Sequence, residues 1–200
     1  SQDLFFLLAH LDVANAHILG SSAGGPIAMQ FALDYPDMTD TLLLINTMSY
    51  ALESERAVRQ RELDQLWSDE ASIGKLASSE RALESRWPGL RETQPERFQM
   101  LLDINLERFE GIASTVQSYL DIGDSIESRL SELAMPTLIV HGDSDSRISV
   151  RCSHNLQKAI AGSELQIVAG AEHGLLSNEP ELLRNMMTQF LQRQAIQTSP

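Results

Sequence analysis

Short stretches rich in Leu, Ile and Val occur at residues 16–19, 41–45, 135–140 and 164–168. Short apolar runs of this kind predict buried strands of a parallel sheet. Apolar residues recur instead with a helical period at residues 3–11, 26–33 and 181–194. This alternation predicts an α/β fold with about four mostly parallel strands and flanking helices.

A long helical segment separates the second and third predicted strands. Residues 50–134 are rich in Leu, Glu, Arg and Gln and are interrupted at glycines and prolines, which indicates several helices. We therefore divide the chain into a first core part (1–49), a helical lid with its connecting helix (50–134) and a second core part (135–200). A lid at the edge of a sheet covers a pocket and determines which substrate shapes the pocket accepts.

Aromatic residues of the predicted lid are candidates for the lining of that pocket. The aromatic candidates are Trp67, Trp87, Phe98, Phe109 and Tyr119, and Ser21 and Met100 are two further candidates. The alternative is that these side chains merely pack the lid helices together. We favour this alternative for most of them, because aromatic residues dominate small cores.

A serine motif follows the first predicted strand. Residues 20–24 read Gly-Ser-Ser-Ala-Gly, a G-x-S-x-G pentapeptide between a strand and a helix-period run. A serine on such a tight turn is a nucleophile elbow, and the flanking glycines are expected to relieve crowding in the turn. The following helix directs its first N–H groups and its positive end toward the site. The pentapeptide alone also suits an ordinary turn, so its interpretation depends on the rest of the chain.

Carboxylates and a histidine follow the last two predicted strands. Residues 135–140 lead into His141-Gly142-Asp143-Ser144-Asp145, and residues 164–168 lead toward Glu172-His173. Because the carboxyl ends of parallel strands meet at one edge of a sheet, we expect these side chains to lie near the serine.

With these motifs the chain resembles the α/β-hydrolases of the serine-esterase, lactonase and carbon–carbon-hydrolase branch. Segments 19–36, 135–150 and 164–191 carry the resemblance. In that family a G-x-x-D turn supplies the acid, which corresponds here to Gly142 and Asp145. A G-x-x-H or G-x-G-H turn supplies the base, which corresponds to Gly170 and His173.

The resemblance implies a role for each matching residue. Ser22 would be the nucleophile, His173 its general base, and Asp145 the carboxylate that orients the imidazole. The backbone N–H of Ala23 would be one donor of the oxyanion hole. Asp143 is an alternative acid, but the family spacing favours Asp145.

Other polar residues near the predicted strands receive structural interpretations. Some relatives place the acid after the strand that precedes the lid, but here that position holds Asn46 and no carboxylate. His17 and His141 are interpreted as packing or hydrogen-bonding residues, and Cys152 as a packing residue on a helix. No spacing of His, Cys, Asp or Glu indicates a metal site, and no cofactor is implied.

In the family, a helix like the one at residues 3–11 directly precedes the elbow strand. The strands that come earlier in the family, and the His-Gly loop that supplies a second oxyanion donor, have no counterpart here. We therefore expect a fragment of a longer hydrolase, with an unpaired edge on the elbow strand and low activity by itself. A complete small fold of four strands is the alternative.

Composition excludes several classes of partner. The formal net charge of −13 argues against nucleic acid and against anionic membranes. No run is long and apolar enough to span a membrane, and one cysteine excludes an intrachain disulfide. We expect a cytoplasmic protein whose partner is a small-molecule substrate, while its oligomeric state stays open.

The leading functional hypothesis is a serine hydrolase that cleaves a small carboxylic ester, thioester or lactone through an acyl-enzyme. Hydrolysis of a carbon–carbon bond and cofactor-free perhydrolysis use the same residues and stay open. Dehalogenase and epoxide-hydrolase chemistry is disfavoured, because those relatives carry Asp where Ser22 stands. The contrasting class is a non-catalytic ligand-binding protein or an inactive fragment.

Overall fold

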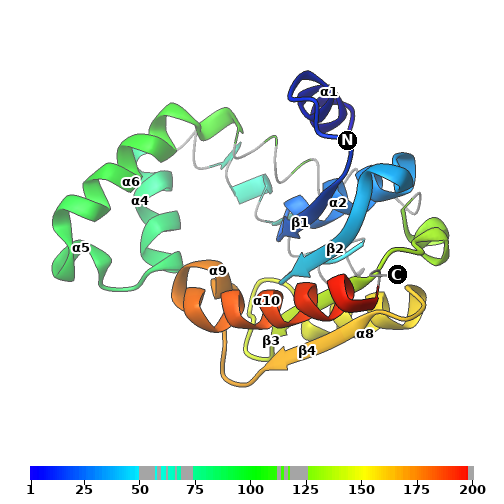
Figure 1. Cartoon of the computed structure of the whole chain (residues 1–200). Helices are drawn as coiled ribbons and strands as arrows, with labels where there is room; N and C mark the ends of the chain where they lie inside the picture. The colour runs from blue at the N-terminus through cyan, green and yellow to red at the C-terminus, as the bar shows by residue number, and fades with distance from the viewer. Residues whose placement is uncertain are drawn as a thin grey trace. The chain divides into compact units, whose positions relative to one another are not determined.

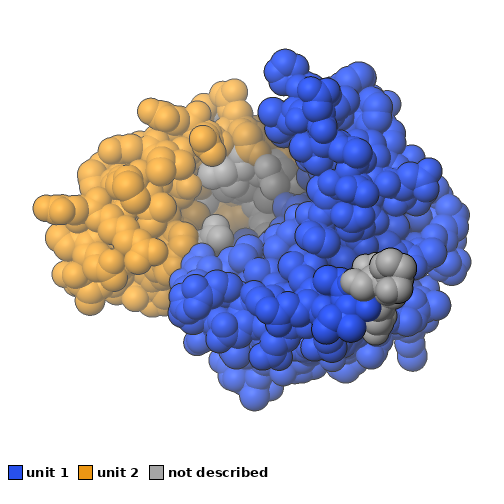
Figure 2. All heavy atoms as spheres, viewed as in Figure 1, with its two compact units in different colours: residues 1–50, 122–200 blue, residues 51–121 orange. Residues whose placement is uncertain are grey.

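The computed structural model divides the chain into two compact units (Figure 2), unit 1 comprising residues 1–50 and 122–200 and unit 2 comprising residues 51–121. It describes residues 1–49, 74–111 and 126–197, together with residues 57, 60, 61, 63–65, 67, 68, 114 and 117. Residues 126–134, which the sequence interpretation assigned to the lid and its connecting helix, belong to unit 1.

Unit 1 is built on a parallel sheet of four strands in the order β1-β2-β3-β4 (Figure 1). The strands are β1 (Ala16–Ser21), β2 (Thr39–Ile45), β3 (Thr137–Gly142) and β4 (Glu164–Val168). Their register aligns Ser21 with Ile45, and Ile45 with Val140. The turns that follow the strands therefore leave the sheet at one common edge. The predicted α/β class and its four parallel strands are confirmed.

Helices cover both faces of this sheet, because successive side chains of a strand point to opposite faces. On β2, Leu42 and Leu44 pack with α2 (Gly24–Asp34), the 3₁₀ helix η2 (Glu127–Glu132) and α8 (Val150–Ala159). Leu43 and Ile45 pack on the other face with α9 (Leu175–Asn178) and α10 (Pro180–Gln197). A strand covered on both faces has no polar alternation, which explains the apolar run at 41–45.

The two outer strands of the sheet are less buried than the inner strands. Every residue of β3 is buried, whereas every residue of β4 is half-buried or exposed. The interpretation of residues 164–168 as a buried strand is therefore wrong in its burial, because β4 pairs only with β3 among the described residues. By the same criterion β1 pairs only with β2.

Short segments complete unit 1. Helix α1 (Gln2–His10) packs Phe5 on Tyr35, with stacked rings 4.6 Å apart, and the 3₁₀ helix η1 (Pro36–Met38) leads into β2. The predicted helix at 181–194 is part of the longer α10. Within the part of the chain that the structure describes, no helix has both the length and the apolar character needed to cross a membrane.

The described part of unit 2 is helical. It contains α4 (Gly74–Arg86), α5 (Leu90–Thr93) and α6 (Pro95–Glu107). Pro95 occupies the first turn of α6, where the N–H that proline lacks has no helical partner. A small core of Leu83, Leu90, Phe98 and Leu102 joins these helices.

Candidate active site

Ser22 occupies a sharp turn between β1 and α2. Its φ is +51°, a left-handed conformation that few residues other than glycine adopt. The backbone N–H of Ser22 donates to the carbonyl of Ile45 at 3.0 Å, and its carbonyl accepts from the N–H of Gly25 at 3.0 Å. Strained residues that the surrounding structure holds in place cluster at functional sites. This backbone places the Ser22 side chain at the carboxyl edge of the sheet.

The turn requires glycine at two positions, one of which lies outside the motif. A Cβ on Gly20 would lie 2.6 Å from the carbonyl oxygen of Gly24, and a Cβ on Gly25 would overlap with Oγ1 of Thr47. A Cβ on Gly24 would meet open space. The expectation that both motif glycines relieve crowding is therefore wrong for Gly24, because the close approach to Thr47 falls on the next residue.

This difference predicts opposite effects of two neighbouring substitutions. Gly25→Ala is expected to destabilise the protein by about 1–3 kcal/mol, as overpacking of a tight contact does. Gly24→Ala is expected to be neutral or slightly stabilising, because alanine is the better helix former. Urea unfolding of the two variants measures both effects. Equal losses of stability in both variants would contradict the role given to Thr47.

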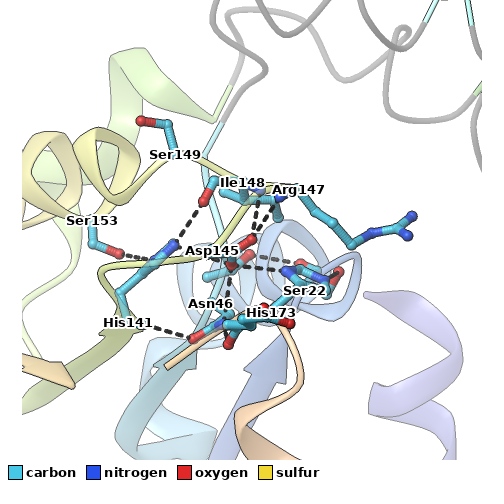
Figure 3. A network of polar contacts seen from close by, with 12 residues as sticks. Ser22, Asn46, His141, Asp145, Arg147, Ile148, Ser149, Ser153 and His173 are labelled. Atoms are coloured by element: carbon cyan, nitrogen blue, oxygen red, sulfur yellow. Dashed lines mark hydrogen bonds and ion pairs between the residues drawn. The ribbon is translucent and has the colours of Figure 1, made fainter. Parts of the chain in front are cut away.

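His173 lies in the turn between β4 and α9 and contacts Ser22 directly. Its Nε2 lies 2.9 Å from Oγ of Ser22, and its Nδ1 lies 2.8 Å from Oδ2 of Asp145 (Figure 3). An ionised carboxylate only accepts hydrogen bonds, so Nδ1 of a neutral His173 carries the proton and donates it. Nε2 is then an acceptor for the Ser22 hydroxyl, which is the tautomer that a general base needs.

The side chain of Asp145 is fully buried and receives hydrogen bonds at both oxygens. Oδ1 accepts from the backbone N–H of Arg147 at 2.8 Å and of Ile148 at 2.9 Å. Burial acts to raise the pKa of Asp145, but hydrogen bonds from His141, His173 and the Ile148 N–H, with charge on His173, outweigh it. The pKa therefore lies well below its ordinary value of 3.8, and the carboxylate stays ionised.

The alternative acid, Asp143, has a different set of contacts. Its Oδ1 accepts from the N–H of Gly170 at 2.7 Å and from Oγ of Ser144 at 3.1 Å. Gly170 has a φ of +72° and begins the turn that carries His173. The structure thus brings Asp145 to His173, whereas Asp143 holds the start of the same turn.

His141 contacts Asp145 from the side opposite His173, which sequence reasoning missed. It is fully buried, with Nε2 2.9 Å from the carbonyl oxygen of Ile148 and 3.3 Å from Oδ2 of Asp145. Both neighbours are acceptors, so Nε2 carries the proton and Nδ1 accepts from Oγ of Ser153 at 2.5 Å. His141 was interpreted only as a packing or hydrogen-bonding residue, and its place directly before Gly142 was the available signal.

Two residues that follow β2 also reach the site. Oγ1 of Thr47 donates to the carbonyl of Ser22 at 2.6 Å. Nδ2 of Asn46 donates to Oδ2 of Asp145 and to the carbonyl of Glu172, each at 3.0 Å. The sequence interpretation noted only that position 46 lacks a carboxylate. An uncharged polar residue at this strand end, where some α/β-hydrolases are expected to carry the acid, was the signal for a hydrogen-bonding role.

The remaining predicted residues of unit 1 lie as follows. Ala23 is the N-cap residue of α2, so its backbone N–H lies at the positive end of that helix. Ser21 is half-buried at the end of β1, and Cys152 is buried on α8. Among the described residues, no group of His, Cys, Asp and Glu could hold a metal ion.

The candidate pocket residues of the predicted lid differ in exposure. Phe98 and Phe109 are buried, and Trp87 packs on the small core of unit 2. Trp67 and Met100 are about half exposed, at 49% and 54%, and Tyr119 lies outside the described residues. A hollow of about 440 Å³ borders Phe98, but most of its lining is charged, including Glu80, Glu84 and Arg91. The assignment of these residues to a substrate pocket stays a prediction.

Comparison with known proteins identifies relatives of low sequence identity. The chain is 25% identical over 92% of its length to an uncharacterized protein of Mycobacterium tuberculosis, and 21% identical over 88% of its length to a monoacylglycerol lipase of Bos taurus. It spans 58% and 54% of the length of these two curated relatives.

Solved structures share the fold. The crystal structure of an enol-lactonase from Burkholderia xenovorans matches with a TM-score of 0.70 and 20% identity, over 95% of this chain and 70% of that one. The family model described as serine aminopeptidase, S33, matches residues 8–181. The chain therefore belongs to the serine aminopeptidase S33 family of α/β-hydrolases.

Proposed function

We propose that this chain carries the nucleophile, base and acid of a serine hydrolase that cleaves a small carboxylic ester, thioester or lactone. One observation carries the proposal. A continuous line of hydrogen bonds runs from Oγ of Ser22 through His173 to the buried Asp145, with donor–acceptor distances of 2.9 and 2.8 Å. A neutral serine hydroxyl is a poor nucleophile, and this connection to a base is what activates it.

The proposed first half-reaction forms an acyl-enzyme. Oγ of Ser22 attacks the carbonyl carbon while Nε2 of His173 takes the hydroxyl proton, and the carbonyl π electrons move onto oxygen. The N–H of Ala23 donates to that oxyanion, a contribution of about 3 kcal/mol for one such donor. The intermediate collapses as the bond to the leaving alcohol, thiol or lactone oxygen breaks, and His173 returns the proton to it.

The second half-reaction regenerates the serine. A water molecule loses a proton to His173 and attacks the acyl carbon, and the bond to Oγ then breaks as Oγ recovers that proton. The ionised Asp145 stabilises the imidazolium that exists in both steps. Two similar proteins support the choice of substrate class, because one is named a monoacylglycerol lipase and the other an enol-lactonase.

A fluorophosphonate tests the proposal directly. We expect intact-mass analysis of the 200-residue chain to show one adduct, peptide mapping to place it on Ser22, and Ser22→Ala to abolish it. Ser177→Ala, which alters an exposed serine of α9, is the matched control and is expected to be labelled normally. No adduct on a folded wild-type chain would contradict the proposal.

A substrate series with an acyl chain of constant length then tests the substrate class. We expect hydrolysis of a butyryl p-nitrophenyl ester, a butyryl thioester and γ-butyrolactone to exceed hydrolysis of the butyryl p-nitroanilide. Faster cleavage of the anilide would instead indicate an amidase or peptidase. Formation of peracid from acetate and hydrogen peroxide, without ester cleavage, would favour the perhydrolase alternative.

A further inference from the structure

A buried asparagine holds the acid and the base of the proposed site together. Asn46 is 0% exposed and follows the last residue of β2, between the strand ends that carry Ser22 and Asp145. It contacts three other residues: its Nδ2 reaches Asp145 and Glu172, and its Oδ1 lies 3.3 Å from the N–H of Gly142. One side chain therefore connects the turn after β3 with the turn after β4.

The contact with Gly142 fixes which way the Asn46 amide points. An N–H donor requires an acceptor, so the oxygen of the amide faces Gly142 and the NH₂ group faces Asp145 and Glu172. The opposite orientation would place the amide oxygen against the Asp145 carboxylate and leave a buried N–H facing an NH₂ group. Each proton of the NH₂ group then has its own acceptor, one on the acid and one beside the base.

The backbone of Asn46 shows that this side chain is placed at a conformational cost. Its φ is +44°, in the left-handed region that asparagine tolerates better than most residues. Ser22 is the neighbouring example, at +51°, and both residues follow the ends of adjacent, paired strands. The N–H of Asn46 donates to the carbonyl of Val140 at 2.9 Å, so the turn is tied to β3 as well.

We propose that Asn46 is a positioning residue that sets the distance and tautomer of the His173–Asp145 pair. The inference rests on the proposed function of Ser22, His173 and Asp145. Asn46 acts through Asp145 and through Glu172, the residue before His173. Its hydrogen bond keeps Oδ2 of Asp145 facing Nδ1 of His173, so that the proton stays on Nδ1 and Nε2 stays free to accept.

Two substitutions separate the side chain from the backbone. Asn46→Gly removes the amide but accepts a φ of +44° without strain, whereas Asn46→Ala removes the amide and keeps the strain. Asn185→Ala, at an exposed position of α10, is the control for the loss of an asparagine. Leu130→Ala, at the buried residue of η2, is the control for a loss of stability that leaves the site contacts intact.

The first readout is the tautomer of His173, measured by ¹⁵N NMR of the imidazole. In the wild type and in both controls we expect the Nδ1–H form and a protected downfield Nδ1–H proton. In Asn46→Gly and Asn46→Ala we expect this proton to exchange rapidly and the Nε2–H form to become populated. An unchanged His173 spectrum in a folded Asn46→Gly variant would overturn the proposal.

The second readout is the rate at which Ser22 reacts with a fluorophosphonate. Both Asn46 variants are expected to react at least about tenfold more slowly than the wild type, as for the loss of one hydrogen bond to a charged group. A rate equal to that of the wild type would overturn the proposal. If the folded wild type itself is unreactive, the proposed function fails, while the NMR comparison still decides the role of Asn46.

Discussion

Asp145→Asn is expected to lower the rate of Ser22 phosphonylation by about 10⁴-fold, the effect known for loss of the carboxylate in a Ser-His-Asp triad. The reason lies in the two oxygens of Asp145. Oδ1 accepts from the backbone N–H groups of Arg147 and Ile148, which can only donate. In the variant the amide oxygen must therefore take this place, and the NH₂ group must face His173.

An NH₂ group facing His173 reverses the tautomer of the imidazole. Nδ1 then has to accept, the ring proton moves to Nε2, and Nε2 no longer accepts the proton of Ser22. Asn46 also loses an acceptor, because its Nδ2 donates to Oδ2 in the wild type, whereas His141 keeps the carbonyl of Ile148. We expect a loss of stability of about 1–3 kcal/mol from the buried Asn46 donor left without this partner.

The measurement for Asp145→Asn is the second-order rate constant of fluorophosphonate labelling, with urea unfolding to establish that the variant is folded. Asp143→Asn is the matched control, because its amide oxygen can still accept from the N–H of Gly170. It is expected to react at nearly the wild-type rate. A wild-type labelling rate in Asp145→Asn, or a large loss of labelling rate in Asp143→Asn, would contradict the assignment of Asp145 as the acid.

His173→Ala is expected to reduce labelling of Ser22 by about 10⁶-fold, which is below detection in most assays. The variant removes the base that lies 2.9 Å from Oγ of Ser22. It also leaves the buried Asp145 carboxylate without a donor that helps to keep its pKa low, so the pKa of Asp145 is expected to rise. Time-resolved intact-mass analysis measures the rate.

His154→Ala is the control for His173→Ala, because His154 is an exposed histidine on α8. It is expected to label at the wild-type rate. Persistent labelling of Ser22 in the His173→Ala variant would mean that another group takes the hydroxyl proton.

Much of the core was predictable from the local pattern of apolar residues, because inner strands appear as apolar runs and amphipathic helices as apolar residues with a helical period. The apolar run at 41–45 lies within β2, and the one at 135–140 overlaps β3, which continues to Gly142. Burial of β4 was not predictable in this way, since it depends on which strands flank it in the sheet. Ile167 shows this, being 40% exposed although it belongs to an apolar stretch.

Site residues were predictable where the side chain itself is reactive. They were not predictable where a residue takes part only through contacts in the folded chain. Ser22, Asp145 and His173 could be proposed from sequence because a serine, a carboxylate and a histidine in this chain order, each after a strand, are typical of the α/β-hydrolases. The contacts of Asn46, His141 and Thr47 join segments far apart in the chain, and no local pattern reports such contacts. Gly25 was missed for the same reason, because its crowding comes from Thr47 after the next strand.

The sequence separations within the site have a consequence for folding. Ser22 and His173 are 151 residues apart, and Asn46 and Glu172 are 126 apart, so no contact between them forms during early local folding. During synthesis Ser22 emerges long before His173. If the two residues act as proposed, Ser22 stays unreactive until the turn after β4 is in place. Covalent labelling of Ser22 would therefore report when the turn after β4 has reached the Ser22 turn, and it offers a kinetic probe of this step of folding.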